Sequence, residues 1–423
     1  MTNFVKKNKI MYLTSHFLSH KHKYRLATMR VIWYHGTAQK KKRMKAILAL
    51  EDGTVYEGSA IGATGTATGA VCFNTAVAGY QELITDPASR GLIPVMTYPL
   101  IGNYGVCEAD NESARPQANA IIVSELARLH SNWHSTEDMG TWMSANGLVG
   151  IAGIDCRAVA THIRDNGTMR GCVTTELSAD EAVAAAKAAP ALEGTELVSS
   201  VSTAETYVWQ GESRAWKLPN KTAGDMSNYC ELPAATGKMV VYDFGVTRST
   251  LATLRRHGFE CTVVPAGTSA ENVLSMGADA VFLSGGPGDP APLAAISAEI
   301  AKLVGKLPIV GTGIGHQLLA MAFGGKTRKL SFGHHGANQP VKDERIGHVL
   351  ITTQNEDFTV VADSLPSELQ VIQTNMNDNT VAALRHTTLP IFTVQYQPSD
   401  IPGPKGADSY YTEITKMIQA AKA

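Results

Sequence analysis

LPIVGTGIGHQLLA, residues 307–320, decides the fold of the second half of this chain. A short apolar run is followed by three glycines within five residues and then by an apolar helical pattern. This pattern is typical of a buried strand that turns sharply into a helix, the geometry of a nucleophile elbow. Such a turn exposes one side chain at the edge of a sheet and places backbone N–H groups where they can bind an anion. Gly313 occupies the apex and has no side chain, so the turn offers no nucleophile.

Strands and helices alternate along the rest of this half. Apolar strands are expected in KMVVYDFG (238–245), CTVVP (261–265) and AVFLSG (280–285), and a helix is expected over 247–257. This alternation predicts an α/β domain with a doubly wound parallel sheet. Ligands of such sheets bind at the carboxyl ends of the strands.

The first half is richer in β patterns. MKAILALEDGTVYEG (44–58) alternates apolar and polar residues around an Asp-Gly pair, which predicts a hairpin. The Ala-rich segment 178–190 predicts a helix capped by Ser178 and stopped by Pro190. We therefore expect a basic tail, a β-rich α/β domain, an interdomain connection and the α/β domain described above, over residues 1–43, 44–190, 191–237 and 238–423.

Composition narrows the function classes. The chain has 423 residues, 44% of them hydrophobic, 18% charged, with a formal net charge of -1. Residues 1–43 hold eleven Lys or Arg and no acidic residue, which leaves 26 basic against 38 acidic residues in the body, a net charge of about −12. A body this acidic is a poor nucleic-acid binder. No apolar run is long enough to predict a membrane span. The six cysteines are widely spaced, which favours reduced thiols and a cytoplasmic location.

Three interpretations of residues 1–43 stay open: a disordered basic tail, a targeting segment, or an upstream start codon with Met44 as the functional start. The segment lacks the clean apolar stretch and the small-residue cleavage site of a secretory signal. Its four histidines are irregularly spaced, which favours a solvated tail over a metal site.

Long stretches from both halves carry a resemblance to a known family. They are LEDGTVYEGSAIGATG (50–65), FNTAVAGYQELITDP (73–87), IGNYGV (101–106), GIDCRAVATHIRDNG (153–167), VYDFG (241–245), FLSGGPGDPAP (282–292), GHQLLA (315–320), FGHHGAN (332–338) and the PGP at 402–404. Over residues 44–421 the chain resembles the small chain of carbamoyl phosphate synthetase, a class I glutamine amidotransferase. The resemblance implies an α/β small-chain domain followed by an amidotransferase domain.

The catalytic residues of that family are replaced here. The family elbow reads G-[IV]-C-[LM]-G-H-Q, with Cys as nucleophile, and a distant H-P-E supplies the base and the carboxylate that orients it. This chain has Gly313 at the Cys position and Gln397 and Ser399 at the His and Glu positions. Thr312 is not expected to substitute, because adjacent strand side chains point in opposite directions. We therefore expect no intact catalytic triad and no glutaminase activity.

Part of the glutamine pocket matches the family. The matching positions are Gly286, Gly288, Ile314, Gln317, Asn355 and Phe358. Ala88 stands where the family has a Ser hydroxyl, although Ser89 leaves a one-residue shift open. Glu356 and Asp357 replace His-Gly, and two carboxylates there would repel the α-carboxylate of glutamine. Glutamine binding is therefore doubtful, and structural retention of these residues is the favoured interpretation.

No cofactor or metal site is expected in this chain. His334 and His335 are interpreted as part of a structural loop with no carboxylate nearby, and His316 as a structural residue. No Walker A or GxGxxG phosphate loop occurs, so ATP and Mg²⁺ are expected to belong to the large-chain partner that the resemblance implies.

The resulting hypothesis is a small subunit in arginine and pyrimidine biosynthesis that supports an ammonia-using large chain. Two alternatives stay open: an ordinary glutamine-hydrolysing small chain, and a non-catalytic interaction protein repurposed from this fold. The presence of a large chain with intact ATP-binding motifs in the same genome would distinguish the second alternative from the main hypothesis.

Deletion of residues 1–43 should leave the melting temperature and large-chain binding unchanged. The expectation rests on the uncompensated basic composition of this segment and on the hairpin that starts at Met44. Thermal unfolding of the full and shortened chains measures it. A fall of several degrees would show that the segment packs on the body.

Overall fold

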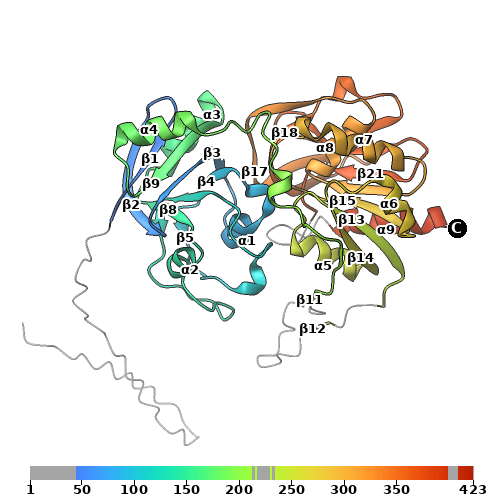
Figure 1. The fold of residues 1–423 in the computed structure, drawn as a ribbon, viewed down its shortest axis with the longest axis horizontal. Coiled ribbons are helices and arrows are strands. Elements are labelled where there is room, and N and C mark those ends of the chain that lie inside the picture. Colours follow the sequence, from blue (N-terminus) through green and yellow to red (C-terminus); the bar gives the residue numbers. More distant parts are fainter. Residues whose placement is uncertain (1–43, 212–214, 217–228, 231–233, 399–407, 423) are drawn as a thin grey trace, which may run out of the picture. The chain divides into compact units, whose positions relative to one another are not determined.

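The computed structural model describes residues 44–211, 215–216, 229–230, 234–398 and 408–422. These residues build two halves, each centred on a β-sheet (Figure 1). The basic segment 1–43 and Ser399 lie outside the described residues, as does part of the expected connection 191–237.

The first half is a closed seven-stranded barrel. Its strands, in order around the barrel, are β1 (Lys45–Leu50), β2 (Val55–Gly62), β8 (Val149–Ala152), β6 (Ala120–Val123), β4 (Leu92–Met96), β3 (Thr66–Asn74) and β9 (Met169–Thr174). Strands β1 and β2 pair antiparallel, so the predicted hairpin is confirmed. In its turn the Thr54 N–H donates to Asp52 Oδ1 at 2.8 Å, and Gly53 has φ 97°, which glycine adopts without a steric penalty.

Four helices accompany the barrel: α1 (Tyr80–Thr85), α2 (Met139–Ala145), α3 (Cys156–Asn166) and α4 (Ala179–Ala188). The predicted cap of α4 is confirmed. The Ser178 side chain accepts from the Glu181 N–H, and the Glu181 side chain accepts from the Ser178 N–H, which together form a capping box. The helix ends directly before Pro190, which cannot continue it.

The second half is a ten-stranded sheet. Its strands in order are β10 (Tyr207–Val208), β14 (Phe259–Pro265), β13 (Gly237–Asp243), β15 (Ala280–Leu283), β16 (Ile309–Thr312), β21 (Ile391–Val394), β20 (Val381–His386), β19 (Leu369–Asn375), β17 (Thr327–Asp343) and β18 (Val349–Val360). Strands β14, β13, β15, β16 and β21 are parallel, which confirms the doubly wound α/β class. The four strands after β21 in this order extend the sheet antiparallel, and the sequence patterns did not predict this extension.

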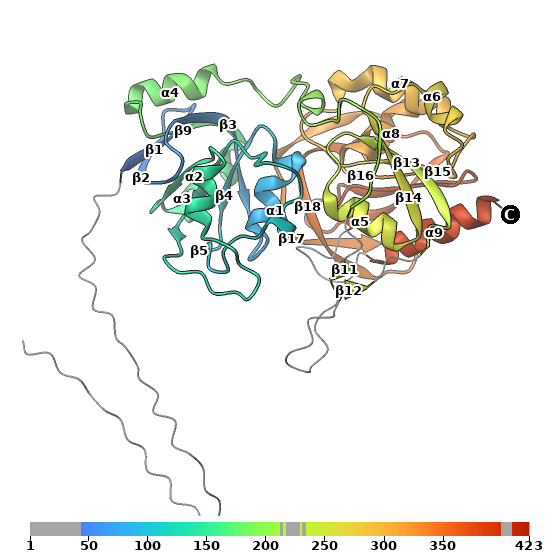
Figure 2. The ribbon, with the colours of Figure 1, turned by 60° about the horizontal axis from the view of Figure 1, so that its bottom comes forward.

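Helices cover both faces of the parallel region (Figure 2). The helices are α5 (Arg248–Arg256), α6 (Ala270–Ser275), α7 (Ala294–Leu303), α8 (Ile314–Ala322) and α9 (Asp408–Lys422). Leu254 of α5 and Ile414 of α9 belong to one buried cluster. Val273 of α6, Ile300 of α7 and Leu318 of α8 belong to another, on the opposite face. Two-sided coverage explains why the parallel strands read as continuous apolar runs.

Short elements complete the described fold. They are β5 (Leu100–Ile101), β7 (Glu125–Leu126), β11 (Ala215–Trp216), β12 (Tyr229–Cys230) and the 3-10 turns η1 (Pro87–Ser89), η2 (Glu108–Asp110), η3 (Val198–Ser200), η4 (Ala291–Leu293) and η5 (Ala362–Ser364).

Direct contacts join the barrel to the second half. The Thr75 N–H donates to the His335 carbonyl at 3.1 Å. The Glu112 carboxylate accepts from the Ser249 N–H in the first turn of α5 at 2.9 Å. A third contact involves η1 itself: Asn355 Nδ2 of β18 donates to Ser89 Oγ at 3.1 Å.

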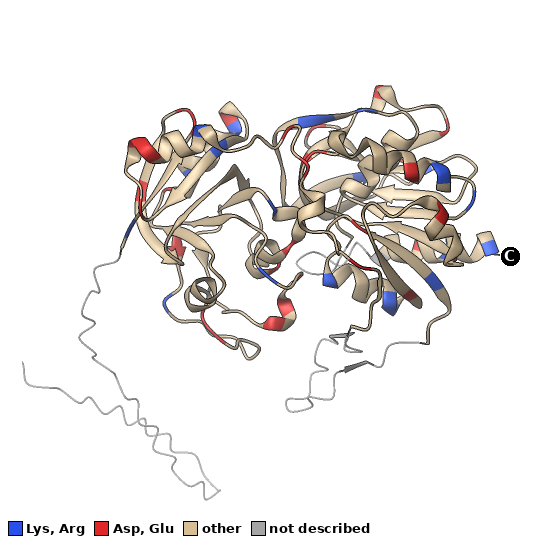
Figure 3. Ribbon diagram, viewed as in Figure 1, with Lys and Arg blue, Asp and Glu red and all other residues tan. Residues whose placement is uncertain are grey.

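Charged residues are spread over both halves (Figure 3). Lys and Arg lie on elements of both halves, and the nine residues of α5 include three arginines. No helix among the described residues is long and apolar enough to cross a lipid bilayer.

Candidate functional site

A small cavity lies at the carboxyl ends of the parallel strands β15, β16 and β21. Its volume is about 30 Å³, room for one or two water molecules. Its walls come from both halves: Ala88, Gly285, Gly286, Gly288, Gly313, Ile314, Gln317, Asn355, Glu356, Asp357, Phe358, Gln395 and Gln397. Every site residue that was predicted from the sequence and that the structure describes therefore lines this cavity.

The apex of the β16–α8 turn has the backbone of a nucleophile elbow. Gly313 has φ 52° and ψ −122° and caps the start of α8. The N–H groups of Gly313 and Gly315 are bonded to the carbonyls of Val394 and Ser284. Among the described residues, none accepts from the Ile314 N–H. The turn thus keeps an anion-binding donor beside an apex that has no reactive side chain.

Gly313→Cys should destabilise the protein by about 1–3 kcal/mol, because a side chain at this backbone conformation is strained. A Cβ built on Gly313 also lies 3.2 Å from the Gly285 Cα, which is tight. Urea unfolding measures the change. Gly267→Cys is the matched control, because Gly267 has open space and no positive φ. An equal effect of both substitutions would contradict the argument.

Gln397 takes part in an amide–carboxylate contact beside the cavity. Its Nε2 donates to Asp86 Oδ2 at 2.9 Å. Asp86 caps η1, and its Oδ1 accepts from the Ala88 N–H at 2.9 Å. Burial raises the pKa of Asp86, although hydrogen bonds from Ala88, Gln397 and Asn355 oppose the rise. The sequence reasoning missed Asp86, although it lies in the matching TDP stretch.

Neither hydroxyl considered from the sequence lines the cavity. Ala88 does line it, whereas Ser89 is fully buried behind it. Ser89 donates to the Leu83 carbonyl at 2.7 Å and accepts from Asn355 Nδ2 at 3.1 Å. The one-residue shift left open above is therefore not realised. Thr312 is 2% exposed and is absent from the cavity wall.

The retained amides of the cavity wall bond to protein groups. Gln317 Nε2 donates to the Phe358 carbonyl at 2.8 Å and to Gln395 Oε1 at 3.2 Å. Asn355 Oδ1 lies 2.8 Å from His335 Nδ1. Gln395 is a wall residue that the sequence reasoning missed, and no motif identified it. The wall amides thus contact protein groups on one side, whereas Gln317 Oε1 and Gln395 Nε2 have no hydrogen-bond partner among the described residues.

The two adjacent histidines lie in strand β17 and not in a loop, and each has a carboxylate beside it. His334 Nε2 lies 2.9 Å from Asp378 Oδ2, and its Nδ1 lies 3.9 Å from Glu356 Oε1. His335 Nε2 lies 3.5 Å from Asp357 Oδ1. The expectation of no nearby carboxylate is therefore wrong. Strand pairing between β17 and β18 and the turn after β19 bring these distant residues together.

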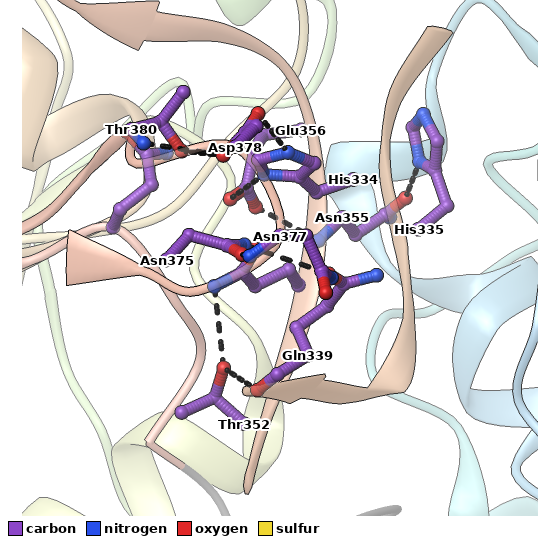
Figure 4. A network of polar contacts seen from close by, with 12 residues as sticks. His334, His335, Gln339, Thr352, Asn355, Glu356, Asn375, Asn377, Asp378 and Thr380 are labelled. Carbon is purple, nitrogen blue, oxygen red and sulfur yellow. Dashed lines mark hydrogen bonds and ion pairs between the residues drawn. The ribbon is translucent and has the colours of Figure 1, made fainter. Parts of the chain in front are cut away.

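Figure 4 shows His334 directed toward Asp378 and Glu356, while His335 is directed toward Asn355. Burial would raise the pKa of Asp378, but hydrogen bonds from His334 and Thr380 and the His334 charge lower it to about 2. Burial would lower the pKa of His335, but Cys72 and Asp357 outweigh it and raise that pKa well above its ordinary value.

The expected pair of anionic carboxylates facing glutamine needs correction. Burial raises the pKa of Glu356 well above its ordinary value. Burial disfavours the anionic form of Glu356, and Asp357 Oδ1 lies 3.5 Å from His335 Nε2. The repulsion of the glutamine α-carboxylate expected from the sequence is therefore weaker than two unpaired carboxylates would give.

His316 is a core residue. It is fully buried, and its Nδ1 lies 3.0 Å from Thr393 Oγ1. Burial lowers the pKa of His316 to about 3, so it is neutral at ordinary pH. Its place in the interior of α8 is consistent with the structural role expected from the sequence.

The cavity wall has no group for nucleophilic catalysis among the described residues. It contains no thiol, hydroxyl or imidazole, and its titratable groups are Glu356 and Asp357. The wall does contain backbone groups that match the family pattern. They are the glycine turn at 285–288, the Gly313 apex and the Ile314 N–H.

Comparison with known proteins agrees with this architecture. Residues 48–173 match the family described as "Carbamoyl-phosphate synthase small chain, CPSase domain". Residues 240–417 match "Glutamine amidotransferase class-I". These matches correspond to the barrel and to most of the second half.

Curated relatives span nearly the same length. The carbamoyl phosphate synthase small chain of Akkermansia muciniphila is 48% identical over 379 residues, covering 90% of this chain and 99% of that protein. The small chain of Syntrophotalea carbinolica is 45% identical over 377 residues, covering 89% and 98%. That of Nitratidesulfovibrio vulgaris is 42% identical over 379 residues, covering 89% and 99%. On this identity and coverage, and on the two halves described above, the chain belongs to the carbamoyl phosphate synthase small-chain family.

Proposed function

We propose that this small chain has no glutaminase activity of its own and supports a large chain that uses free ammonia. One observation carries the proposal: the cavity wall at the β16–α8 turn contains no nucleophile and no imidazole. In this proposal the small subunit serves arginine and pyrimidine biosynthesis through its partner, which binds ATP and Mg²⁺.

Amide hydrolysis by this family's chemistry needs three functions in one place. A nucleophile attacks the amide carbon, a base moves the proton to the leaving ammonia, and a third group orients the base. Gly313 supplies no nucleophile. Gln397 carries a neutral amide, which donates a hydrogen bond to Asp86 and cannot act as a base at neutral pH. Ser399 stands where the orienting carboxylate would be needed.

The small size of the cavity also argues against glutamine binding. Its volume of about 30 Å³ is far below the several hundred Å³ of typical small-molecule sites. The Nε2 group of Gln317 already donates to the Phe358 carbonyl and to Gln395 Oε1. Glycines 286 and 288 are explained by the backbone alone. A Cβ on Gly286 would lie 2.0 Å from the Phe244 carbonyl oxygen, so this position requires glycine without any ligand.

Two measurements test the proposal. Glutamate release from glutamine should equal the background rate, for the purified chain and for its complex with the large chain. Co-purification with a tagged large chain should give a stable complex. Glutamate release above background would overturn the loss of activity, and failure to co-purify would overturn the supporting role.

Calorimetric titration with glutamine separates binding from catalysis. We expect no saturable heat at millimolar glutamine. Gln317→Ala is the informative variant, since it opens the wall by removing a group that now bonds to protein. Saturable binding by the unmodified chain would show that the cavity opens readily, contrary to the proposal.

A further inference from the structure

Three side chains with metal-binding chemistry converge in the first half of the chain, away from the cavity. The Sγ of Cys107, a carboxylate oxygen of Asp110 and a ring nitrogen of His134 all lie within 4.8 Å of one another. Asp110 Oδ1 and His134 Nε2 are 3.5 Å apart. None of the three lines the cavity at the β16–α8 turn.

The spacing fits a small tetrahedral metal site. Zinc bonds of roughly 2.0–2.3 Å at tetrahedral angles separate the donor atoms by roughly 3.3–3.8 Å. The Asp110–His134 distance already lies in that range, and the remaining donors need only a modest contraction. Thiolate and imidazole donors favour zinc, whereas Mg²⁺ and Ca²⁺ prefer sites made of oxygen alone.

We propose that Cys107, Asp110 and His134 bind a zinc ion, with a water molecule as the fourth ligand. The side chains of His134 and Asp110 are 17% and 32% exposed, so the site lies near the surface of the chain. Zinc takes the Cys107 thiolate, and the displaced thiol proton passes to solvent. The proposal replaces the expectation that this chain holds no metal, and it is independent of the proposed function.

The backbone around the three donors is already fixed. The Val106 N–H donates to the Glu137 carbonyl at 3.0 Å, and the Thr136 N–H donates to the Val106 carbonyl at 2.9 Å. These bonds tie the segment before Cys107 to the segment after His134.

The amide of Gln81 fixes Cys107 from the other side. Its Oε1 accepts from the Cys107 N–H at 2.9 Å, and its Nε2 donates to the Cys107 carbonyl at 2.6 Å. A site held in this way needs little ordering when metal binds. Zinc would then act as a clamp between the loop that contains η2 and the loop that follows β7.

The test uses the full chain, stripped with a chelator and then titrated with Zn²⁺ or Co²⁺. We expect one zinc ion per chain at this site, a zinc-dependent rise in melting temperature, and thiolate-to-cobalt charge-transfer absorption with Co²⁺. Cys107→Ser should abolish that absorption. Cys107→Ser and His134→Ala should each weaken zinc binding more than about 100-fold, beyond the usual effect of changing an outer-shell partner.

His162→Ala is the matched control. His162 and Asp52 form an exposed pair at 2.6 Å that belongs to no three-donor cluster among the described residues. This variant should bind zinc as the unmodified chain does. Circular dichroism checks that each variant is folded, and Asp110→Asn gives a second conservative variant.

Two results would overturn the proposal. The first is the absence of thiolate-to-cobalt absorption in the unmodified chain. The second is undiminished zinc affinity in folded Cys107→Ser and Asp110→Asn, which would assign bound zinc to other groups such as the histidines of residues 1–43.

Discussion

With ammonium as the nitrogen source, the complex of this chain with its large chain should form carbamoyl phosphate at a rate that rises about tenfold per pH unit near neutrality. The large-chain reaction needs NH3 as the nucleophile, and the NH3 fraction of ammonium rises by that factor until another group titrates. Glutamine at millimolar concentration should neither support nor inhibit synthesis. The reason is the cavity, whose wall has no nucleophile and whose volume is only about 30 Å³.

Carbamoyl phosphate formation is followed at fixed ammonium from about pH 7 to about pH 9, with the large chain alone as the control. Gly313→Cys should not restore glutamine use, because triad members act as a unit and Gln397 and Ser399 would still lack base and carboxylate. Equal rates from glutamine and ammonium at neutral pH would mean that a nucleophile outside the family pattern is at work.

Acid should unfold this protein in part through His316. Burial lowers the pKa of His316 to about 3 in the folded chain, against an ordinary value of about 6.5. Below about pH 6.5 the unfolded chain therefore binds a proton that the folded chain does not. The free energy of unfolding should fall by about 2.5 kcal/mol from this group between about pH 7.5 and about pH 4.5. The contribution is complete above the unfolded pKa and is lost as the pH falls.

Urea unfolding of the unmodified chain and of His316→Asn isolates this effect. Other groups titrate in the opposite sense: burial raises the pKa of Glu112 to about 7, so its contribution is lost as the pH rises. The contributions of these other groups cancel when the unfolding free energy of His316→Asn is subtracted from that of the unmodified chain at each pH. An unchanged pH dependence in His316→Asn would contradict a neutral, buried His316.

Local patterns predicted much of the fold. The hairpin around Asp52, the cap at Ser178 and the helix after Thr247 depend on neighbouring residues, so the sequence was sufficient to find them. The closed barrel and the antiparallel extension of the second sheet were not predicted. Both depend on pairing between strands far apart in the sequence, which local periodicity does not encode.

The cavity illustrates the same limit. Residues with a family motif were predicted to meet, and they line one cavity. Asp86 and Gln395 were missed, because a carboxylate or an amide becomes a site residue only through what packs against it. The repulsion assigned to Glu356 and Asp357 was overestimated for the same reason, since their histidine partners come from strand β17.

The sequence by itself determined the family, because the matching stretches are properties of the residues alone. It also determined that the apex has no nucleophilic side chain, because the apex residue is Gly313. Only the tertiary structure decided the environment of the charged groups: it raises the pKa of Glu356, pairs His334 with Asp378, joins Gln397 to Asp86 and gathers Cys107, Asp110 and His134. The physical reason is that burial and the charges of neighbouring groups set the protonation and contacts of a side chain, and both depend on residues distant in the chain.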